Sequence, residues 1–73
     1  MRIKIGKTLR GIRKLTGKKQ HEIAALIFVS RATYSAWEND KGCPSLIQIY
    51  AFTNAVNIPI QSFILKLEED QEI

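Results

Sequence analysis

The side chains best suited to contact a ligand lie between Arg31 and Asn39, in the stretch RATYSAWEN. On a helical wheel at about 100° per residue, this stretch places Thr33, Tyr34 and Trp37 on one side, which we expect to face a core. The opposite side consists of short side chains with one arginine: Arg31, Ala32, Ser35, Ala36 and Asn39. Short side chains let a helix approach another surface closely, and a DNA major groove is wide enough to admit such a helix. A solvated face that happens to be small is the alternative interpretation.

Few residues in this chain are suited to catalysis or to metal binding. It contains one histidine, His21, one cysteine, Cys43, and no carboxylate cluster within an apolar stretch. We therefore expect no enzyme and no metal or cofactor, because no nucleophile, acid–base pair or ligand set can be assembled. Cys43 cannot form an intrachain disulfide and has no partners for a zinc site. We interpret it as a neutral thiol, either in a loop or half-buried.

The periodicity of apolar residues predicts five short helices and no strands. Ile5, Leu9 and Ile12 form one stripe, and Gly17 is well placed to end the first helix in the left-handed conformation. Ser30 and Ser45 are suited to cap the third and fourth helices. The expected helices span residues 2–16, 19–27, 31–39, 45–56 and 59–68. We expect an all-α, compact five-helix bundle.

Residues 20–39 read as two of these helices joined by an abrupt turn. Lys19 stands where an N-cap is expected and is a poor cap. Gln20 and His21, in the first turn, could donate hydrogen bonds to an anion at this helix N-terminus. Fraying explains the poor cap equally well, and a solvated surface histidine is the simpler interpretation of His21.

The charge is distributed unevenly along the chain. Residues 1–41 hold ten Lys and Arg against three acids, whereas residues 42–73 hold one Lys against four acids. A basic N-terminal half indicates a polyanion as partner for that half. The longest apolar run, 23–29, is too short to span a bilayer, and no signal-peptide pattern opens the chain. We expect a single-domain, complete, cytoplasmic polypeptide without a membrane or small-molecule partner.

Taken together, these residues resemble the lambda-repressor-like helix-turn-helix domain, the Cro/cI-type or XRE family. The resemblance covers about residues 5–63. It rests on IGKTLRGIRK, Gly17, Gln20, Ile23-Ala24, Val29-Ser30-Arg31, Trp37-Glu38-Asn39, Pro44-Ser45-Leu46 and Ala55-Val56. It implies that the helix beginning near Arg31 lies in the major groove, with the preceding helix across the backbone.

The resemblance also implies roles for single residues. Base contacts fall to Arg31, Ala32, Ser35 and Ala36, and phosphate contacts to Gln20, His21, Asn39 and Lys41. The family's pair between the first helix and the recognition helix corresponds to Arg13 and Glu38, which we interpret as a structural ion pair. Relatives usually act as dimers on paired half-sites. Candidate interface residues are Ile47, Ile64, Leu65 and Leu67.

Three positions depart from the family pattern. Phe28 replaces the glycine usual between the two helices, which implies a strained residue or a turn of different shape. For its side chain we expect packing against the core rather than a ligand role. Ala32 and Ala36 replace residues that are often polar, so direct readout would rest mainly on Arg31 and less on Ser35.

Two functions of different class follow from these observations. The first is a dimeric, sequence-specific transcriptional regulator, a small repressor or controller protein that binds double-stranded DNA at paired half-sites. The second is a protein-interaction module, such as an antitoxin-like partner with weak or no DNA binding. The apolar character of Phe28, Ala32 and Ala36 favours the second.

Overall fold

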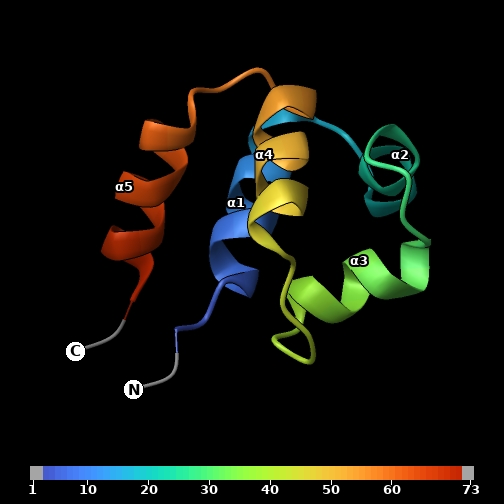
Figure 1. Cartoon of the computed structure of the whole chain (residues 1–73), viewed down its shortest axis with the longest axis horizontal. Coiled ribbons are helices and arrows are strands. Elements are labelled where there is room, and N and C mark those ends of the chain that lie inside the picture. The colour runs from blue at the N-terminus through green and yellow to red at the C-terminus, as the bar shows by residue number, and fades with distance from the viewer. Residues whose placement is uncertain (1–2, 72–73) are drawn as a thin grey trace.

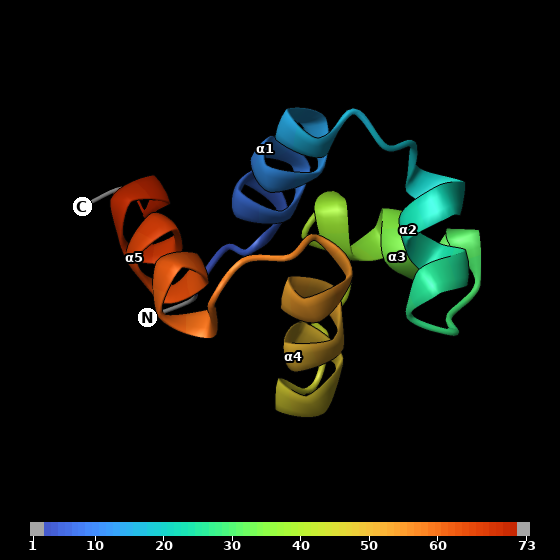
Figure 2. The same ribbon diagram turned by 90° about the horizontal axis from the view of Figure 1, so that it is seen from above.

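The helices pack in two layers with a pair of helices at one end. The computed structural model describes residues 3–71, in which no strand occurs. The five helices are α1 (Gly6–Thr16), α2 (Gln20–Leu26), α3 (Arg31–Glu38), α4 (Leu46–Ala55) and α5 (Ile60–Asp70). α4 lies in front of α1, α5 forms one end of the molecule, and α2 and α3 form the other (Figure 1, Figure 2). The expectation of an all-α five-helix bundle is confirmed.

Two helices differ from their expected bounds for identifiable reasons. α1 begins at Gly6 rather than at residue 2, which lies outside the described residues. Asp40 Oδ1 accepts the backbone N–H groups of Ile5 (3.1 Å) and Gly6 (2.9 Å), so a loop remote in sequence caps the helix there. α5 continues to Asp70, two residues further than expected, because Lys66 Nζ lies 2.9 Å from Asp70 Oδ1. The bounds of α2, α3 and α4 agree with expectation to within one residue at each end.

A buried aromatic stack joins the helices. The rings of Tyr34 and Trp37 on α3 meet edge to face at 6.0 Å, and Tyr34 stacks on Phe52 of α4 at 6.3 Å. Phe52 in turn meets Phe63 of α5 at 6.1 Å. Such pairs stabilise a core beyond the area they bury. Aliphatic residues from α1, from α2 and from the ends of these helices and of α4 complete it: Ile5, Leu9, Ile12, Ile23, Ala24, Ile27 and Val56.

Thr33, which we expect to face the core, is exposed. It lies at the solvent edge of α3, where Ser30 Oγ donates to its hydroxyl oxygen at 2.9 Å. The N-terminal turn of α3 therefore satisfies this hydroxyl locally and leaves the core to Tyr34. Leu46, the first residue of α4, is also exposed, at 72%. Among residues 3–71, no helix is long and apolar enough to cross a membrane.

Candidate nucleic-acid interface

The turn between α2 and α3 contains a backbone conformation that is usual for glycine, although no glycine occupies it. Phe28 has φ +60°, in the left-handed region. The N–H of Val29 donates to the carbonyl of Ala24 at 3.0 Å, which closes the end of α2. Ser30 then caps α3 by accepting the N–H of Thr33 at 3.0 Å. The usual corner is thus kept at the cost of backbone strain at Phe28.

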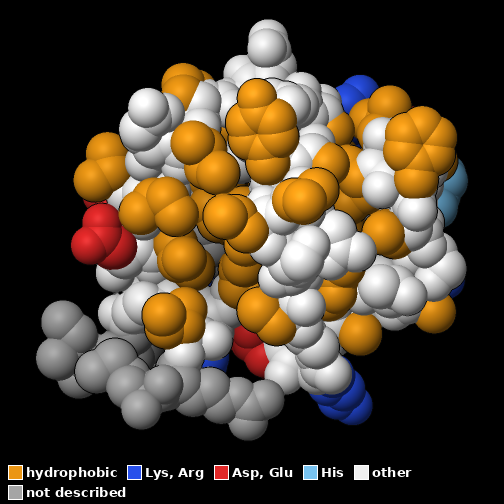
Figure 3. All heavy atoms as spheres, viewed as in Figure 1, with side chains coloured by type: hydrophobic (Ala, Val, Ile, Leu, Met, Phe, Trp, Pro, Cys, Tyr) orange, Lys and Arg blue, Asp and Glu red, His pale blue; other side chains and the backbone are white. Residues whose placement is uncertain are grey.

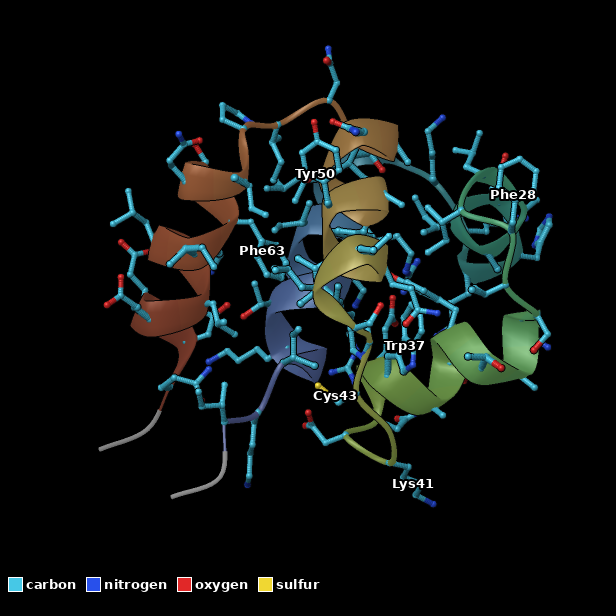
Figure 4. The ribbon with its side chains drawn as sticks, in the orientation of Figure 1. Phe28, Trp37, Lys41, Cys43, Tyr50 and Phe63 are labelled. Carbon is cyan, nitrogen blue, oxygen red and sulfur yellow. The ribbon has the colours of Figure 1, made fainter. Side chains whose placement is uncertain are left out.

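The expected packing of Phe28 against the core is wrong. Its side chain is 95% exposed. A left-handed residue at a sharp corner directs its side chain outward, and the neighbouring Ile27 and Val29 supply the core contacts instead. Figure 4 shows Phe28 at the α2–α3 corner, pointing away from the bundle.

The outer face of α3 carries the residues that the sequence pattern places there. Arg31, Ala32 and Asn39 are exposed, and Ser35 and Ala36 are half-buried at the middle of the helix. The exposed Thr33 adds a hydroxyl that the helical wheel missed. The spacing of Ser30 and Thr33, in which an N-cap and the third helical residue share a hydrogen bond, is the signal that could have revealed it.

The four residues expected to contact phosphate differ in their exposure and in whether their side chains already form hydrogen bonds within the protein. His21 and Lys41 are exposed. Gln20 is half-buried, and its Nε2 donates to Glu38 Oε1 at 2.9 Å. Asn39 Nδ2 donates to the carbonyl of Ser35 at 2.9 Å and approaches Ser35 Oγ at 3.4 Å. Both amides are therefore engaged within the protein, and only their remaining hydrogen-bonding capacity faces solvent.

A buried carboxylate fixes α3 against α1 and α2. Arg13 Nε and Nη2 donate to the two carboxylate oxygens of Glu38 at 2.6 and 3.1 Å. The Glu38 side chain is 1% exposed, and that of Arg13 is 14% exposed. Arg13 Nη1 also donates to the carbonyl of Lys18 at 3.1 Å, which extends the network into the α1–α2 loop. Two-pronged pairing of this kind restricts the orientation of both side chains.

The protonation of this cluster follows from its surroundings. Burial acts to raise the pKa of Glu38, but hydrogen bonds from Arg13 and Gln20 outweigh it, so the pKa lies below its ordinary 4.5. The pKa of Arg13 is raised, chiefly by its hydrogen bonds to Glu38. The hydroxyl of Tyr34 lies near this charged pair without hydrogen-bonding geometry, and burial raises its pKa. Glu38 is thus a carboxylate, and Arg13 a cation, at neutral pH.

The C-terminal end of α3 abuts the N-terminal end of α1. A Cβ atom at Gly6 would lie 2.2 Å from the carbonyl oxygen of Glu38, so only glycine allows this approach. Arg10 Nη2 donates to the same carbonyl at 2.8 Å. Arg10 and the cap from Asp40 are anchoring contacts that the sequence pattern did not reveal, because both span about thirty residues of chain. They fix the direction in which α3 presents its outer face.

Exposed apolar side chains gather on the face formed by α4 and α5 (Figure 3). Of the candidate interface residues, Ile47 is 80%, Leu65 62% and Ile64 43% exposed. Leu67 packs against the core instead, because it lies on the same side of α5 as Phe63. Leu46 and Tyr50 join the exposed set, and their spacing with Ile47 on one helix face is a signal that could have identified them. We call Leu46, Ile47, Tyr50, Ile64 and Leu65 the α4–α5 face.

Metal ligands do not gather in the described part of the chain. No group of three His, Cys, Asp or Glu residues is placed to hold an ion in residues 3–71. Cys43 is exposed in the loop before α4.

Comparison with known proteins matches one family. The helix-turn-helix family model HTH_3, of the Cro/cI-like type, matches residues 9–63, which include most of the core, the corner and the outer face of α3. No curated protein matches the chain.

Proposed function

The chain belongs to the XRE-type helix-turn-helix family of DNA-binding regulators, and from this we propose that it is a sequence-specific transcriptional regulator. It binds double-stranded DNA in the cytoplasm as a homodimer on paired half-sites and represses by occupying its operator. The observation that carries the proposal is the outer face of α3. Its short side chains and Arg31 are exposed while a buried ion pair fixes the orientation of the helix.

Base readout rests mainly on Arg31. It stands at the first turn of α3, where its guanidinium can donate two hydrogen bonds to guanine O6 and N7. Ala32 and Ala36 leave room for close approach and can contact a thymine methyl. His21 and Lys41 are free to contact phosphate, and Gln20 can do so with the amide N–H that Glu38 does not use.

Ser35 can form a hydrogen bond with a base edge. Its hydroxyl oxygen accepts a hydrogen bond from Asn39 Nδ2 at 3.4 Å, which leaves the hydroxyl proton and a second lone pair for another partner. Ser35 therefore contributes a contact of lower selectivity than Arg31.

The α4–α5 face supports dimerisation. Five large apolar side chains exposed on one face of a small domain form a patch typical of an interface. Half-sites one helical turn apart require the two recognition helices to lie about 34 Å from each other. The molecule is 33 Å long, with α5 at one end and α2 and α3 towards the other. A two-fold axis beside α4 and α5 therefore keeps the two α3 helices well separated, as this spacing requires.

The test begins with selection of bound sequences from a random DNA pool, which identifies the half-site and its spacing. Affinity for that site is then measured across a salt series. We expect log K to fall with log[salt] by about 0.9 per neutralised phosphate. The variant Arg31→Ala should lose roughly 1–3 kcal/mol at the selected site and relax its preference at one base pair.

Arg31→Lys is the matched control. It keeps the positive charge and loses the planar fork, so it should relax base preference while retaining the salt dependence. If Arg31→Ala binds with unchanged sequence preference, Arg31 does not read bases. If no sequence is enriched from the pool, the proposed function is wrong.

A further inference from the structure

Phe28 combines two features that are unfavourable for an aromatic residue. The corner uses a left-handed backbone conformation, which glycine occupies without strain, but it does not use the ring, which is 95% exposed. Either feature alone is uncommon for an aromatic residue. Because neither contributes to the core, a role for the side chain lies outside the folded subunit.

Other apolar side chains are exposed at the corner beside the ring of Phe28. Leu26, the last residue of α2, is 50% exposed, and Ala25 beside it is exposed as well. We call Ala25, Leu26 and Phe28 the corner patch. Phe28 points away from the corner, and Tyr50 lies on a different helix (Figure 4).

The corner patch lies outside the proposed dimer interface. It is at the end of the molecule opposite α5 (Figure 1). A two-fold axis through it would bring the two α3 helices together, which contradicts the separation that paired half-sites need. A second copy on this patch is also disfavoured by charge, because each copy presents cations there.

Those cations flank the patch on both sides. Arg31 is exposed three residues after Phe28, and Lys18 and Lys19 precede α2, a helix only about 10 Å long. The one acid on α2, Glu22, is turned back to its own helix terminus, where its Oε1 accepts the N–H of Lys19 at 2.8 Å. The surroundings of the patch are therefore positive, and a complementary surface is acidic.

We infer that the corner patch is a docking site for a protein partner with an apolar pocket for Phe28 and acidic residues around that pocket. A partner seated there covers Arg31, so it and DNA compete for the chain. The docking of an acidic partner is argued from the charge and exposure of the patch; the exclusion of a second copy by half-site spacing, and the competition with DNA, rest on the proposed function.

The experiment uses the full chain as bait for a displayed library of random peptides, with Phe28→Gly as counter-bait. Phe28→Gly suits this purpose because it removes the ring and relaxes the backbone, so it folds at least as well as the natural chain. A peptide from the enriched pool is synthesised and its binding measured by fluorescence anisotropy. The control variant is Leu15→Ala, which shortens another highly exposed apolar side chain, on α1 and 85% exposed.

We expect the enriched peptides to combine acidic residues with aromatic or aliphatic ones. Phe28→Gly should weaken peptide binding by about tenfold or more, as loss of an aromatic anchor does, and Leu15→Ala should leave it unchanged. Adding the selected DNA should displace the peptide from the natural chain.

Three results would overturn the inference. One is a pool that binds Phe28→Gly as well as the natural chain. Another is a shift in the monomer–dimer equilibrium of Phe28→Gly in analytical ultracentrifugation, which would make a second copy the occupant. The third is binding of the natural chain, and not of Phe28→Gly, to phospholipid vesicles. Peptide binding without displacement by DNA would retain the docking site and contradict only its overlap with the DNA-binding surface.

Discussion

Replacement of Glu38 by glutamine tests whether the buried ion pair fixes the recognition helix. Glutamine has the shape of glutamate but no charge, and its amide would present N–H groups to the donors of Arg13 and Gln20. Removing one partner of a buried pair typically costs about 3–5 kcal/mol, because the remaining charge is left unpaired away from water. Glu38 is 1% exposed on its side chain, so this full range applies.

The loss is large on the scale of the whole domain. A chain of 73 residues has a free energy of unfolding of roughly 4–11 kcal/mol, at 0.05–0.15 kcal/mol per residue. Glu38→Gln should therefore remove about a quarter or more of the free energy of unfolding. In urea titrations with an m value of about 1 kcal/mol/M, the midpoint should fall by about 3–5 M. Where the natural midpoint is lower than that, the variant should be unfolded in buffer.

The same experiment at low pH gives an independent check. The pKa of Glu38 is lowered in the folded protein, so its contribution is fully present above the unfolded value of about 4.5. It is lost as the pH falls through the folded pKa. The difference in unfolding free energy between the natural chain and Glu38→Gln should therefore be largest at pH 7 and narrow progressively below about pH 4.

Glu69→Gln is the matched control, since Glu69 is exposed on α5 and its neutralisation should change stability by no more than about 0.5 kcal/mol. A cost below about 1 kcal/mol for Glu38→Gln, or a difference that does not depend on pH, would refute the reasoning. Either result would mean that α3 is fixed by its other contacts, the aromatic stack and the bond from Arg10 to the Glu38 carbonyl, rather than by the ion pair.

Substitutions at Phe28, Gly6 and Gly11 test the backbone geometry at the corner and the packing of α1. Phe28→Gly should raise the unfolding free energy by about 0.5–1 kcal/mol in thermal melts, because relief of about 1–2 kcal/mol of left-handed strain exceeds the added chain entropy. Phe28→Ala, which keeps a Cβ, should give no such gain; an equal gain would show that backbone strain is not the cause. Gly6→Ala should cost about 1–3 kcal/mol, because its Cβ would lie 2.2 Å from the carbonyl oxygen of Glu38. Gly11→Ala, with no atom within 4 Å of its Cβ, should instead stabilise α1 by up to about 1 kcal/mol, and a loss there would contradict the packing described for α1.

The sequence alone determined the helices and most of their inward faces. Apolar spacing of three and four residues locates all five helices, and Ser30, Ser45 and Gly17 mark ends that need only local chemistry. The periodicity also separates the outer face of α3 from Tyr34 and Trp37. These features depend on neighbours within one or two turns, which is the range over which a sequence pattern carries information.

Tertiary structure decided how α3 is held and which apolar residues remain outside. The cap from Asp40 and the bond from Arg10 join residues about thirty positions apart, and no local pattern marks such partners. Leu67 and Ile64 are three residues apart on α5, yet one packs against the core and the other is exposed. Phe28 shows most clearly what could not be predicted from the sequence. Its replacement of a glycine was visible in the sequence, but the outward direction of its ring depends on the backbone at a corner that only the packed helices define.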